Sequence, residues 1–229
     1  MSKRSVIVTG GFGALGRVVA AAFAAQGDQV ARVDFARQAP DALAGALDLG
    51  GVDLTDPEAA ARIVAAVKAE FGGIGVLVNI AGGFIWETLT DGSVATWQRM
   101  YAMNLVTAAT MTKAALPELK AVPAGRIVNI GAGAALKADA GMGAYAASKS
   151  AVHRLTESLA AELSGEDVTV NAVLPSIIDT PTNRADMPTA DFGKWVQPQA
   201  IADVILFLTS PAARSVTGAL IPVTRGTPA

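Results

Sequence analysis

The chain has 229 residues, of which 52% are hydrophobic and 17% charged, with a formal net charge of -2. This length and balance suit one folded α/β domain and offer no basic surface for nucleic acid. With no cysteine and one histidine, disulfides and thiol chemistry are excluded and no metal site is expected. No stretch reaches about 18 uninterrupted apolar residues, so we expect a cytoplasmic protein without a membrane partner.

Short β-branched runs alternate along the chain with Ala-rich amphipathic segments, which is typical of a parallel sheet with crossover helices. The expected strands are 5–9, 29–34, 46–52, 76–79, 126–130, 169–174 and 219–223. The expected helices are 15–26, 57–71, 94–119, 145–163 and 198–208. We therefore predict an α/β fold with a single doubly wound, Rossmann-type parallel sheet of about seven strands, helices on both faces, and one domain spanning 1–229.

One stretch breaks this alternation. Residues 176–197 are polar, include Pro181 and Pro188, and show no clean period, which indicates a long loop. Loops of this length in compact domains are usually functional or disordered, and this one follows the carboxyl end of a strand, where doubly wound sheets bind ligands. We interpret it as a lid over a small-molecule substrate.

The first expected strand runs into a glycine-rich turn that opens a helix, Thr9-Gly10-Gly11-Phe12-Gly13-Ala14-Leu15-Gly16. Small residues and free backbone N–H groups at a helix N-terminus suit a pyrophosphate. Asp34 follows eighteen residues after Gly16, where a carboxylate can accept both hydroxyls of an adenosine ribose and would repel a 2′-phosphate. NAD(H) is therefore the favoured cofactor, while the neighbouring Arg32 and Arg37 keep NADP(H) open.

Further cofactor contacts are expected where the third and fourth strands end. Asp53 could hydrogen-bond to an adenine and Leu54 could pack against it, although Asp53 equally suits the start of the next helix. Asn79, Ala81 and Gly82 close the fourth strand, and a glycine there lets the backbone approach a ligand closely, as it also would in a plain turn.

Tyr145 and Lys149 lie four residues apart on an expected helix, so their side chains share one face, with Cβ atoms about 5 to 6 Å apart. A neighbouring ammonium stabilises phenolate, and we expect it to lower the pKa of Tyr145 from its usual value near about 10. Tyr145 is thus a candidate general acid and base, although such a pair also occurs on plain surface faces.

Together, these features resemble the short-chain dehydrogenase/reductase family over essentially the whole chain. The matching features are the 9–16 turn, Asp34, 79–82, Asn104, the Tyr145 and Lys149 pair, and Pro175 after the sixth strand.

The resemblance implies a role for each matching residue. Tyr145 would transfer the proton, and Lys149 would bind the nicotinamide ribose and lower the pKa of Tyr145. Asn104 would hold a proton-relay water, Pro175 would belong to the cofactor site, and Thr180 would hold the nicotinamide carboxamide. A buried hydrogen-bonding role for Asn104 and a turn-starting role for Thr180 are the plain alternatives. The family resemblance also implies a homodimer or homotetramer.

Two positions depart from the family's pattern. Ala14 replaces the middle glycine of the turn, which adds one methyl group. Ala132 stands thirteen residues before Tyr145, where the family has a catalytic serine, and no hydroxyl side chain lies between Gly125 and Ala144. A ketone reductase without that hydroxyl lacks one donor to the developing alkoxide, a deficit on the order of 2 to 4 kcal/mol.

The residues around Ala132 and in the lid resemble the dihydropteridine reductase branch of that family. The similar segments are 131–136, 141–142, 150–153 and 174–195. That branch lacks the serine, uses NADH, and reduces a quinonoid dihydropterin, in which the proton goes to a ring nitrogen. Because an iminoquinonoid acceptor is already electron-poor, it needs less oxyanion stabilisation. We therefore expect an NAD(P)H-dependent reductase of a quinonoid dihydropterin-like substrate, with Tyr145 as proton donor.

Two other functions stay open. The first is a general carbonyl reductase acting on a ketone, a 3-oxoacyl thioester or a hydroxysteroid, with water replacing the missing serine. The second is a dinucleotide-binding protein without turnover, which the joint presence of Tyr145, Lys149 and Asn104 argues against.

Several other residues have competing interpretations. Phe84 and Trp86 could form an aromatic wall at the crevice or pack in the core. Asn183 and Arg184 could contact a polar substrate edge or lie in a solvated loop. His153, two helical turns beyond Tyr145, is interpreted as structural.

Overall fold

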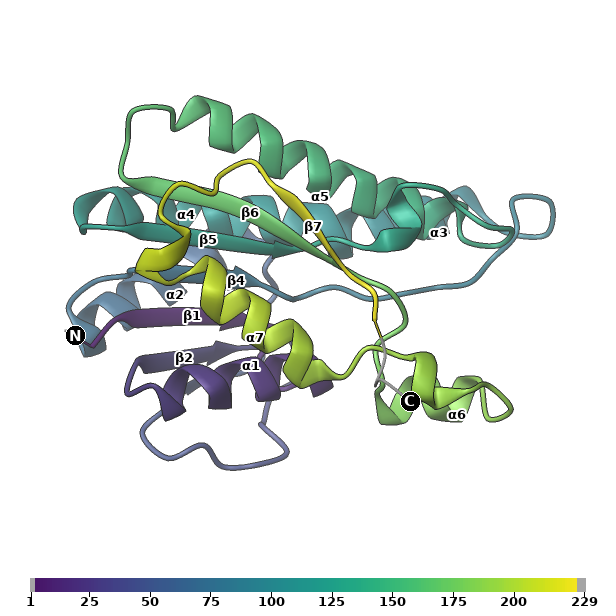
Figure 1. Ribbon diagram of the computed structural model, residues 1–229, viewed down its shortest axis with the longest axis horizontal. Coiled ribbons are helices and arrows are strands. Elements are labelled where there is room, and N and C mark those ends of the chain that lie inside the picture. The colour runs from purple at the N-terminus through teal and green to yellow at the C-terminus, as the bar shows by residue number, and fades with distance from the viewer. Residues whose placement is uncertain (1–2, 226–229) are drawn as a thin grey trace.

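All seven strands of the computed structural model, which describes residues 3–225, lie parallel in one sheet (Figure 1). Their order is β3-β2-β1-β4-β5-β6-β7. The strands are β1 Ser5–Thr9, β2 Gln29–Val33, β3 Leu47–Leu49, β4 Val76–Asn79, β5 Gly125–Ile130, β6 Val168–Pro175 and β7 Leu220–Val223. The order reverses between β1 and β4, so a ligand crevice is expected beyond the carboxyl ends of these two strands. The predicted fold class is confirmed.

Helices cover both faces of the sheet (Figure 1). The helices are α1 Ala14–Ala25, α2 Pro57–Phe71, α3 Val94–Tyr101, α4 Thr107–Ala121, α5 Gly143–Glu162, α6 Pro181–Asp186 and α7 Pro198–Leu208. One face carries α1 and α7, and the other carries α2, α4 and α5. Within residues 3–225, none of these helices combines the length and the apolar character that crossing a membrane requires.

Alternate side chains of each central strand enter opposite cores. In β1, Val6 and Val8 pack beneath α1 and α7, whereas Ile7 packs beneath α2 and α4. Because both faces are covered, Val6, Ile7 and Val8 are all fully buried and the strand shows no apolar–polar alternation. Packing on both faces therefore holds in place the carboxyl ends of the strands, where the candidate site lies.

The long predicted helix 94–119 is interrupted in its first half. Residues Ala102–Val106 form a π-helical turn between α3 and α4, in which one extra residue is accommodated. The difference matters because Asn104 lies in this turn.

The lid, residues 176–197, is also more ordered than a loop. It contains α6 and a short 3₁₀ turn, Phe192–Lys194. Pro181 occupies the first turn of α6, and the Thr180 hydroxyl caps that helix by accepting a hydrogen bond from the Asn183 N–H at 3.2 Å. One of the prolines that predicted an irregular loop, Pro181, therefore begins a helix.

The crossover from β2 to β3, residues 34–46, contains no helix. Parallel strands are usually joined by a helix, which covers one face of the sheet. Here β3 is reduced to Leu47–Leu49, shorter than the predicted 46–52. This crossover is held instead by the ion pairs described below.

We predict that Leu77→Ala lowers the free energy of unfolding by about 2 to 5 kcal/mol, because this fully buried side chain fills the centre of the core. Urea denaturation measures the change. Leu89→Ala, the same substitution at a side chain that is 71% exposed, is the control and should change it by less than about 0.5 kcal/mol. Equal losses would contradict the position of β4 in the core.

Candidate active site

The glycine-rich turn joins β1 to α1 and is tied to the end of β4. The Thr9 hydroxyl accepts hydrogen bonds from the N–H groups of Ile80, at 3.0 Å, and Ala81, at 3.1 Å. A Cβ atom on Gly16 would lie 2.0 Å from the Gly10 carbonyl oxygen, and Gly10 has a φ of +64°. Both positions therefore require glycine.

The N-terminus of α1 has free donors. Its N-cap, Gly13, has no capping side chain, and its first turn, which begins at Ala14, contains no acidic residue. Backbone N–H groups there are thus available to an anion. Ala14, Phe12 and Leu15 fit within the turn, the last two with their side chains buried, so the turn suits a pyrophosphate.

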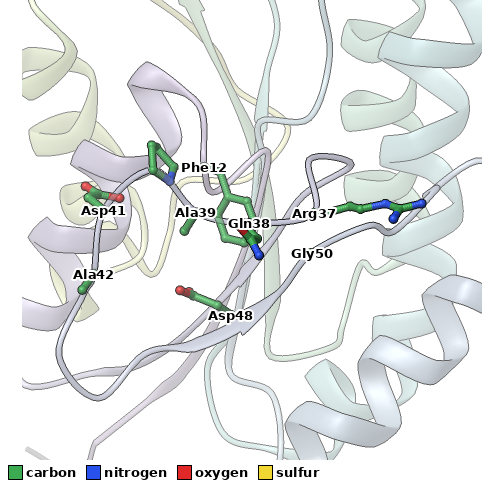
Figure 2. Close-up of a pocket in the computed structure, with 9 residues that line it drawn as sticks. Phe12, Arg37, Gln38, Ala39, Asp41, Ala42, Asp48 and Gly50 are labelled. Carbon is green, nitrogen blue, oxygen red and sulfur yellow. The ribbon is translucent and has the colours of Figure 1, made fainter.

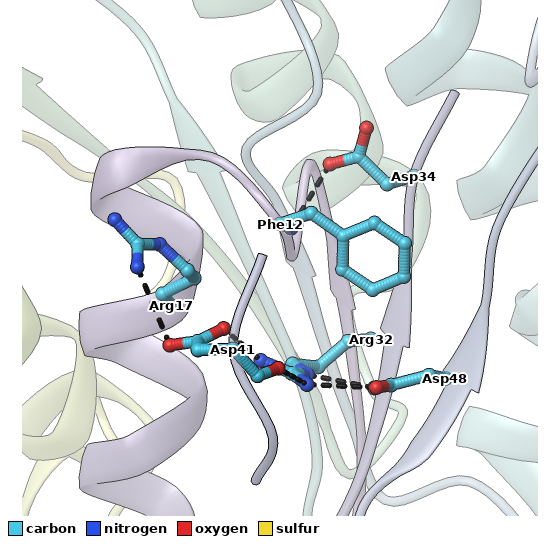
Figure 3. A network of polar contacts seen from close by, with 6 residues as sticks. All are labelled: Phe12, Arg17, Arg32, Asp34, Asp41 and Asp48. Atoms are coloured by element: carbon cyan, nitrogen blue, oxygen red, sulfur yellow. Dashed lines mark hydrogen bonds and ion pairs between the residues drawn. The ribbon is translucent and has the colours of Figure 1, made fainter. Parts of the chain in front are cut away.

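Asp34 faces this turn from the end of β2. Its Oδ2 accepts the N–H of Phe12 at 3.0 Å (Figure 3). Its Oδ1 accepts the N–H of Ala36 at 2.9 Å. A carboxylate oxygen accepts more than one hydrogen bond, so acceptor capacity remains for ribose hydroxyls. Asp34 is therefore both a holder of the turn and a candidate ribose ligand.

Arg32 is buried and fully engaged. Its Nε and Nη2 donate to the two carboxylate oxygens of Asp48, each at 2.7 Å, and its Nη1 donates to Asp41 at 3.0 Å (Figure 3). The ring of Phe12 lies over the guanidinium, 5.5 Å from Cζ. The hydrogen bonds to Asp48 raise the pKa of Arg32. Arg32 is thus unavailable to bind a 2′-phosphate, although its position near Asp34 in the sequence had kept NADP(H) open as a cofactor.

A pocket of about 460 Å³ opens beside this network (Figure 2). It is lined by Phe12, Arg37, Gln38, Ala39, Pro40, Asp41, Ala42, Asp48 and Gly50. Its charged lining consists of Arg37 and two carboxylates, both of which are paired with the buried Arg32.

The candidate adenine residues have structural roles. The Asp53 carboxylate accepts the N–H and the hydroxyl of Thr55, at 2.9 and 2.6 Å, which lowers the pKa of Asp53. The cap of α2 is Asp56, not Asp53. Leu54 is 4% exposed and packs in the core.

Asn79 points into the protein. Its Nδ2 donates to Thr112 Oγ1 and to Asn129 Oδ1, both at 2.9 Å. These bonds cross-link β4 with α4 and β5. The next residues of the turn, Ala81 and Gly82, therefore carry the contacts toward the crevice.

Helix α5 brings Tyr145 and Lys149 to the same edge of the sheet. Lys149 Nζ donates to the Ile130 carbonyl oxygen at 2.7 Å, which anchors it at the end of β5. A Cβ atom on Gly82 would lie 3.6 Å from Lys149 Nζ and 2.4 Å from Asn104 Oδ1. Lys149 and Asn104 thus meet beside a turn that has room only for glycine.

Asn104 is buried at the centre of this arrangement. Its Oδ1 accepts the Gly83 N–H at 3.0 Å, and its Nδ2 donates to the Gly83 carbonyl oxygen and to Ser148 Oγ, at 3.1 and 2.9 Å. The Ser148 hydroxyl in turn donates to the Tyr145 carbonyl oxygen at 2.7 Å. Ser148 was not among the predicted site residues; its position three residues after Tyr145, on the same helix face, was the available signal.

Burial shifts both ionisable groups toward their neutral forms. It raises the pKa of Tyr145 to about 12 and lowers that of Lys149 to about 8. The expectation that Lys149 lowers the Tyr145 pKa is therefore wrong for this structure, because desolvation dominates. At neutral pH, Tyr145 is a phenol that retains its proton and is suited to donate it.

Ala132 leaves this site without a second side-chain donor. It follows β5, is 4% exposed, and its N–H points to His153 Nε2 at 3.4 Å. A Cβ atom on Gly131 would lie 2.5 Å from the same nitrogen, so the imidazole occupies that space. Burial lowers the pKa of His153, and its packing agrees with the structural role predicted for it.

Aromatic side chains flank Tyr145 on the open side. The Phe84 ring lies edge-on to the Tyr145 ring, with centroids 5.0 Å apart, and is 53% exposed. Trp86 is 62% exposed and lies against Gly141. Neither belongs to the core, so the aromatic-wall interpretation is the one that fits.

Comparisons with known proteins agree with this geometry. A family model described as short chain dehydrogenase matches residues 4–191. Meso-2,3-butanediol dehydrogenase of Serratia marcescens is 32% identical over 98% of this chain and 94% of its own length. A 3-oxoacyl-[acyl-carrier-protein] reductase of Vibrio cholerae is 31% identical over 99% of this chain and 98% of its own.

Solved structures of dehydrogenases have the same fold as this chain. The ligand-free aldohexose dehydrogenase of Thermoplasma acidophilum superposes with a TM-score of 0.88 at 27% identity, covering 96% of this chain and 92% of that one. A short-chain dehydrogenase/reductase, glucose/ribitol dehydrogenase, of Brucella melitensis has the same TM-score at 30% identity, covering 96% and 94%.

We predict that burial of Lys149 makes stability depend on pH. Between its folded pKa of about 8 and the ordinary value of 10.5, the unfolded chain binds more protons, so the free energy of unfolding rises with pH. Lys149→Met removes this rise. The stability of the wild type relative to the variant should therefore increase by about 2 kcal/mol from pH 8 to 10, measured by urea denaturation.

Lys113→Met, at an exposed position of α4, is the matched control and should keep the wild-type pH dependence. A constant difference between the wild type and Lys149→Met across this range would contradict the burial of the ammonium.

Proposed function

We propose a substrate class for this chain, which belongs to the short-chain dehydrogenase family and is an NAD(P)(H)-dependent oxidoreductase. Its substrate would be a planar, electron-poor acceptor of the quinonoid dihydropterin class. The observation that carries the proposal is the pairing of a protonated Tyr145 with Ala132, which supplies no hydroxyl. A site with one proton donor and no serine hydroxyl to stabilise an oxyanion suits an acceptor that is already electron-poor.

We propose that the cofactor is NADH and that the glycine-rich turn and the start of α1 hold its pyrophosphate. Asp34 would accept the ribose hydroxyls, and its carboxylate would disfavour a 2′-phosphate nearby. Arg37 is the cation that would have to accept that phosphate in the alternative with NADPH. The proposed contacts farther along are Asp53 at the adenine, and Ala81, Gly82, Pro175, Thr180, Tyr145 and Lys149 toward the nicotinamide. The buried side chains of Leu54 and Asn79 have structural roles instead.

When bound, a reduced nicotinamide supplies a hydride. Tyr145 would donate the proton from its phenol Oη to the acceptor, directly or through water. Lys149, held by the Ile130 carbonyl oxygen, would bind the nicotinamide ribose. Asn104, held by Gly83 and Ser148, keeps that edge of the site polar and suits a relay water. Phe84, whose ring contacts that of Tyr145, and Trp86 would offer exposed aromatic surface to a planar acceptor.

Ala132 selects the acceptor class. Reduction of a ketone develops negative charge on an oxygen, and loss of one hydrogen-bond donor to that charge costs on the order of 2 to 4 kcal/mol. In a quinonoid dihydropterin the incoming charge and proton settle on a ring nitrogen of a conjugated system. The missing hydroxyl then costs little.

Reduction of ordinary ketones is the second candidate function. The similarity to a meso-2,3-butanediol dehydrogenase and to a 3-oxoacyl-[acyl-carrier-protein] reductase favours this function. In this chain a water would have to replace the missing serine. Association into a homodimer or homotetramer remains a proposal that rests on the family resemblance. A cytoplasmic location and a single domain with a lid at 176–197 remain proposals that rest on the composition, length and pattern of the sequence.

The deciding assay follows oxidation of NADH and of NADPH with quinonoid dihydropterin and, separately, with simple ketones. We expect NADH with the pterin to give the highest kcat/KM. Tyr145→Phe should lower kcat by at least about a hundredfold, since it removes the proton donor. Turnover of ketones but not of the pterin would replace this proposal with the second candidate.

We predict that Ala132→Ser raises kcat for ketones by at least about tenfold, because the new hydroxyl can donate to the alkoxide, and leaves pterin reduction within about twofold. Steady-state kinetics with both acceptors measure the two effects on one enzyme preparation. An equal gain for both acceptors would show that the missing donor does not distinguish them.

A further inference from the structure

The two ends of the lid are fastened to each other. Ile178 pairs with Val196 in a parallel β-bridge. The Val196 N–H donates to the Ile177 carbonyl oxygen at 2.9 Å, and the Asp179 N–H donates to the Val196 carbonyl oxygen at 2.8 Å. Because Val196 is fully buried, this bridge forms a rigid base from which α6 and the 192–194 turn project.

Arg184 crosses from α6 back to that base. Its Nε and Nη2 donate to the two oxygens of Asp179, at 2.5 and 2.8 Å. Gln197, at the far end of the lid, donates to Asp179 Oδ2 at 2.8 Å. The Asp179 side chain is 7% exposed, so this bidentate pair is shielded on the carboxylate side.

The flat face of the same guanidinium contacts the remaining part of the lid. Arg184 Cζ lies 4.6 Å from the centre of the Phe192 ring. Phe192 packs against Trp195, with ring centroids 4.7 Å apart, and Trp195 is buried. One side chain thus links the start, the middle and the end of the lid.

Thr180 is the residue next to this clamp. It follows Asp179 directly, and its hydroxyl caps α6. Asn183 Nδ2 donates to the Ile178 carbonyl oxygen at 2.7 Å, which adds a second bond from α6 to the base. The conformation of Thr180 is therefore set by contacts on both sides of it.

We propose that Arg184 is a positioning residue that closes the lid on itself and thereby holds Thr180 in the orientation that receives the nicotinamide carboxamide. This inference rests on the proposed function, in which Thr180 makes that contact. Arg184 acts through Asp179, since its Nε, its Nη2 and one face of the guanidinium are already engaged within the lid.

The clamp persists at neutral pH. Hydrogen bonds from Arg184 and Gln197 lower the pKa of Asp179 to about 2. A carboxylate with a lowered pKa contributes its full effect above the ordinary value of 3.8 and loses it as the pH falls toward 2. Variants can therefore be compared at pH 7 without titration of this pair.

The test compares Arg184→Met, which keeps an apolar stem against Phe192, with Arg184→Lys, which keeps the charge but not the bidentate geometry. Arg154→Met is the matched control, because Arg154 is 69% exposed and pairs with a carboxylate, that of Glu157, on α5. Equilibrium binding of NADH is followed by its fluorescence, and amide hydrogen exchange is followed across 181–195.

For Arg184→Met we expect NADH to bind at least about fivefold more weakly. Amide exchange should accelerate at least about tenfold in 181–195 while exchange in the β-strands stays unchanged. Arg184→Lys should recover part of both effects, and Arg154→Met should match the wild type. This pattern would support positioning, because general destabilisation would also accelerate exchange in the strands.

Three results would overturn the proposal. Unchanged lid exchange would show that Arg184 does not hold the lid. Faster exchange throughout the sheet would assign it a general structural role. Unchanged NADH affinity with a raised KM for the acceptor alone would make Arg184 a substrate contact.

Failure of the proposed function can be distinguished from failure of the role proposed for Arg184. If the wild type binds NADH but reduces neither pterin nor ketone, the reaction is wrong, while the NADH affinities still decide the role of Arg184. If the wild type binds no NADH, the role given to Thr180 falls with the reaction, and hydrogen exchange alone decides whether Arg184 closes the lid.

Discussion

The carboxamide of Asn104 joins three segments that are distant in sequence. It binds both backbone groups of Gly83 after β4 and the hydroxyl of Ser148 on α5, from a π-helical turn between α3 and α4. A regular α-helix would rotate this residue by about 100° per position, so the extra residue of the π turn sets its direction. The placement of Tyr145 and Lys149 relative to the turn after β4 depends on this contact.

Much of the fold could be predicted from the sequence because the sheet is buried on both faces. β1 and β4 are short, mainly apolar runs followed by turn residues, and both were predicted with the bounds observed. The placement of Tyr145 and Lys149 one turn apart on a single helix followed from their spacing. These features depend on local periodicity, which a single sequence displays.

The remaining features depend on contacts that no local pattern reveals. The π turn uses ordinary helix-forming residues, so it leaves no periodic signature. Arg32 was considered a possible phosphate ligand because its partners, Asp41 and Asp48, become neighbours only after the crossover folds back. The direction of the Tyr145 pKa shift depends on how deeply the ring is buried, which spacing along a helix does not determine.

The carboxylate of Asp34 has a consequence for how this protein could change over evolution. It supports the glycine-rich turn through the Phe12 N–H and faces the place proposed for the ribose. In the proposed function, dinucleotide preference and local order therefore depend on the same carboxylate. A lineage drifting toward the phosphorylated dinucleotide would first have to supply the Phe12 N–H with another acceptor, so the path is expected to pass through paired substitutions and to be rare.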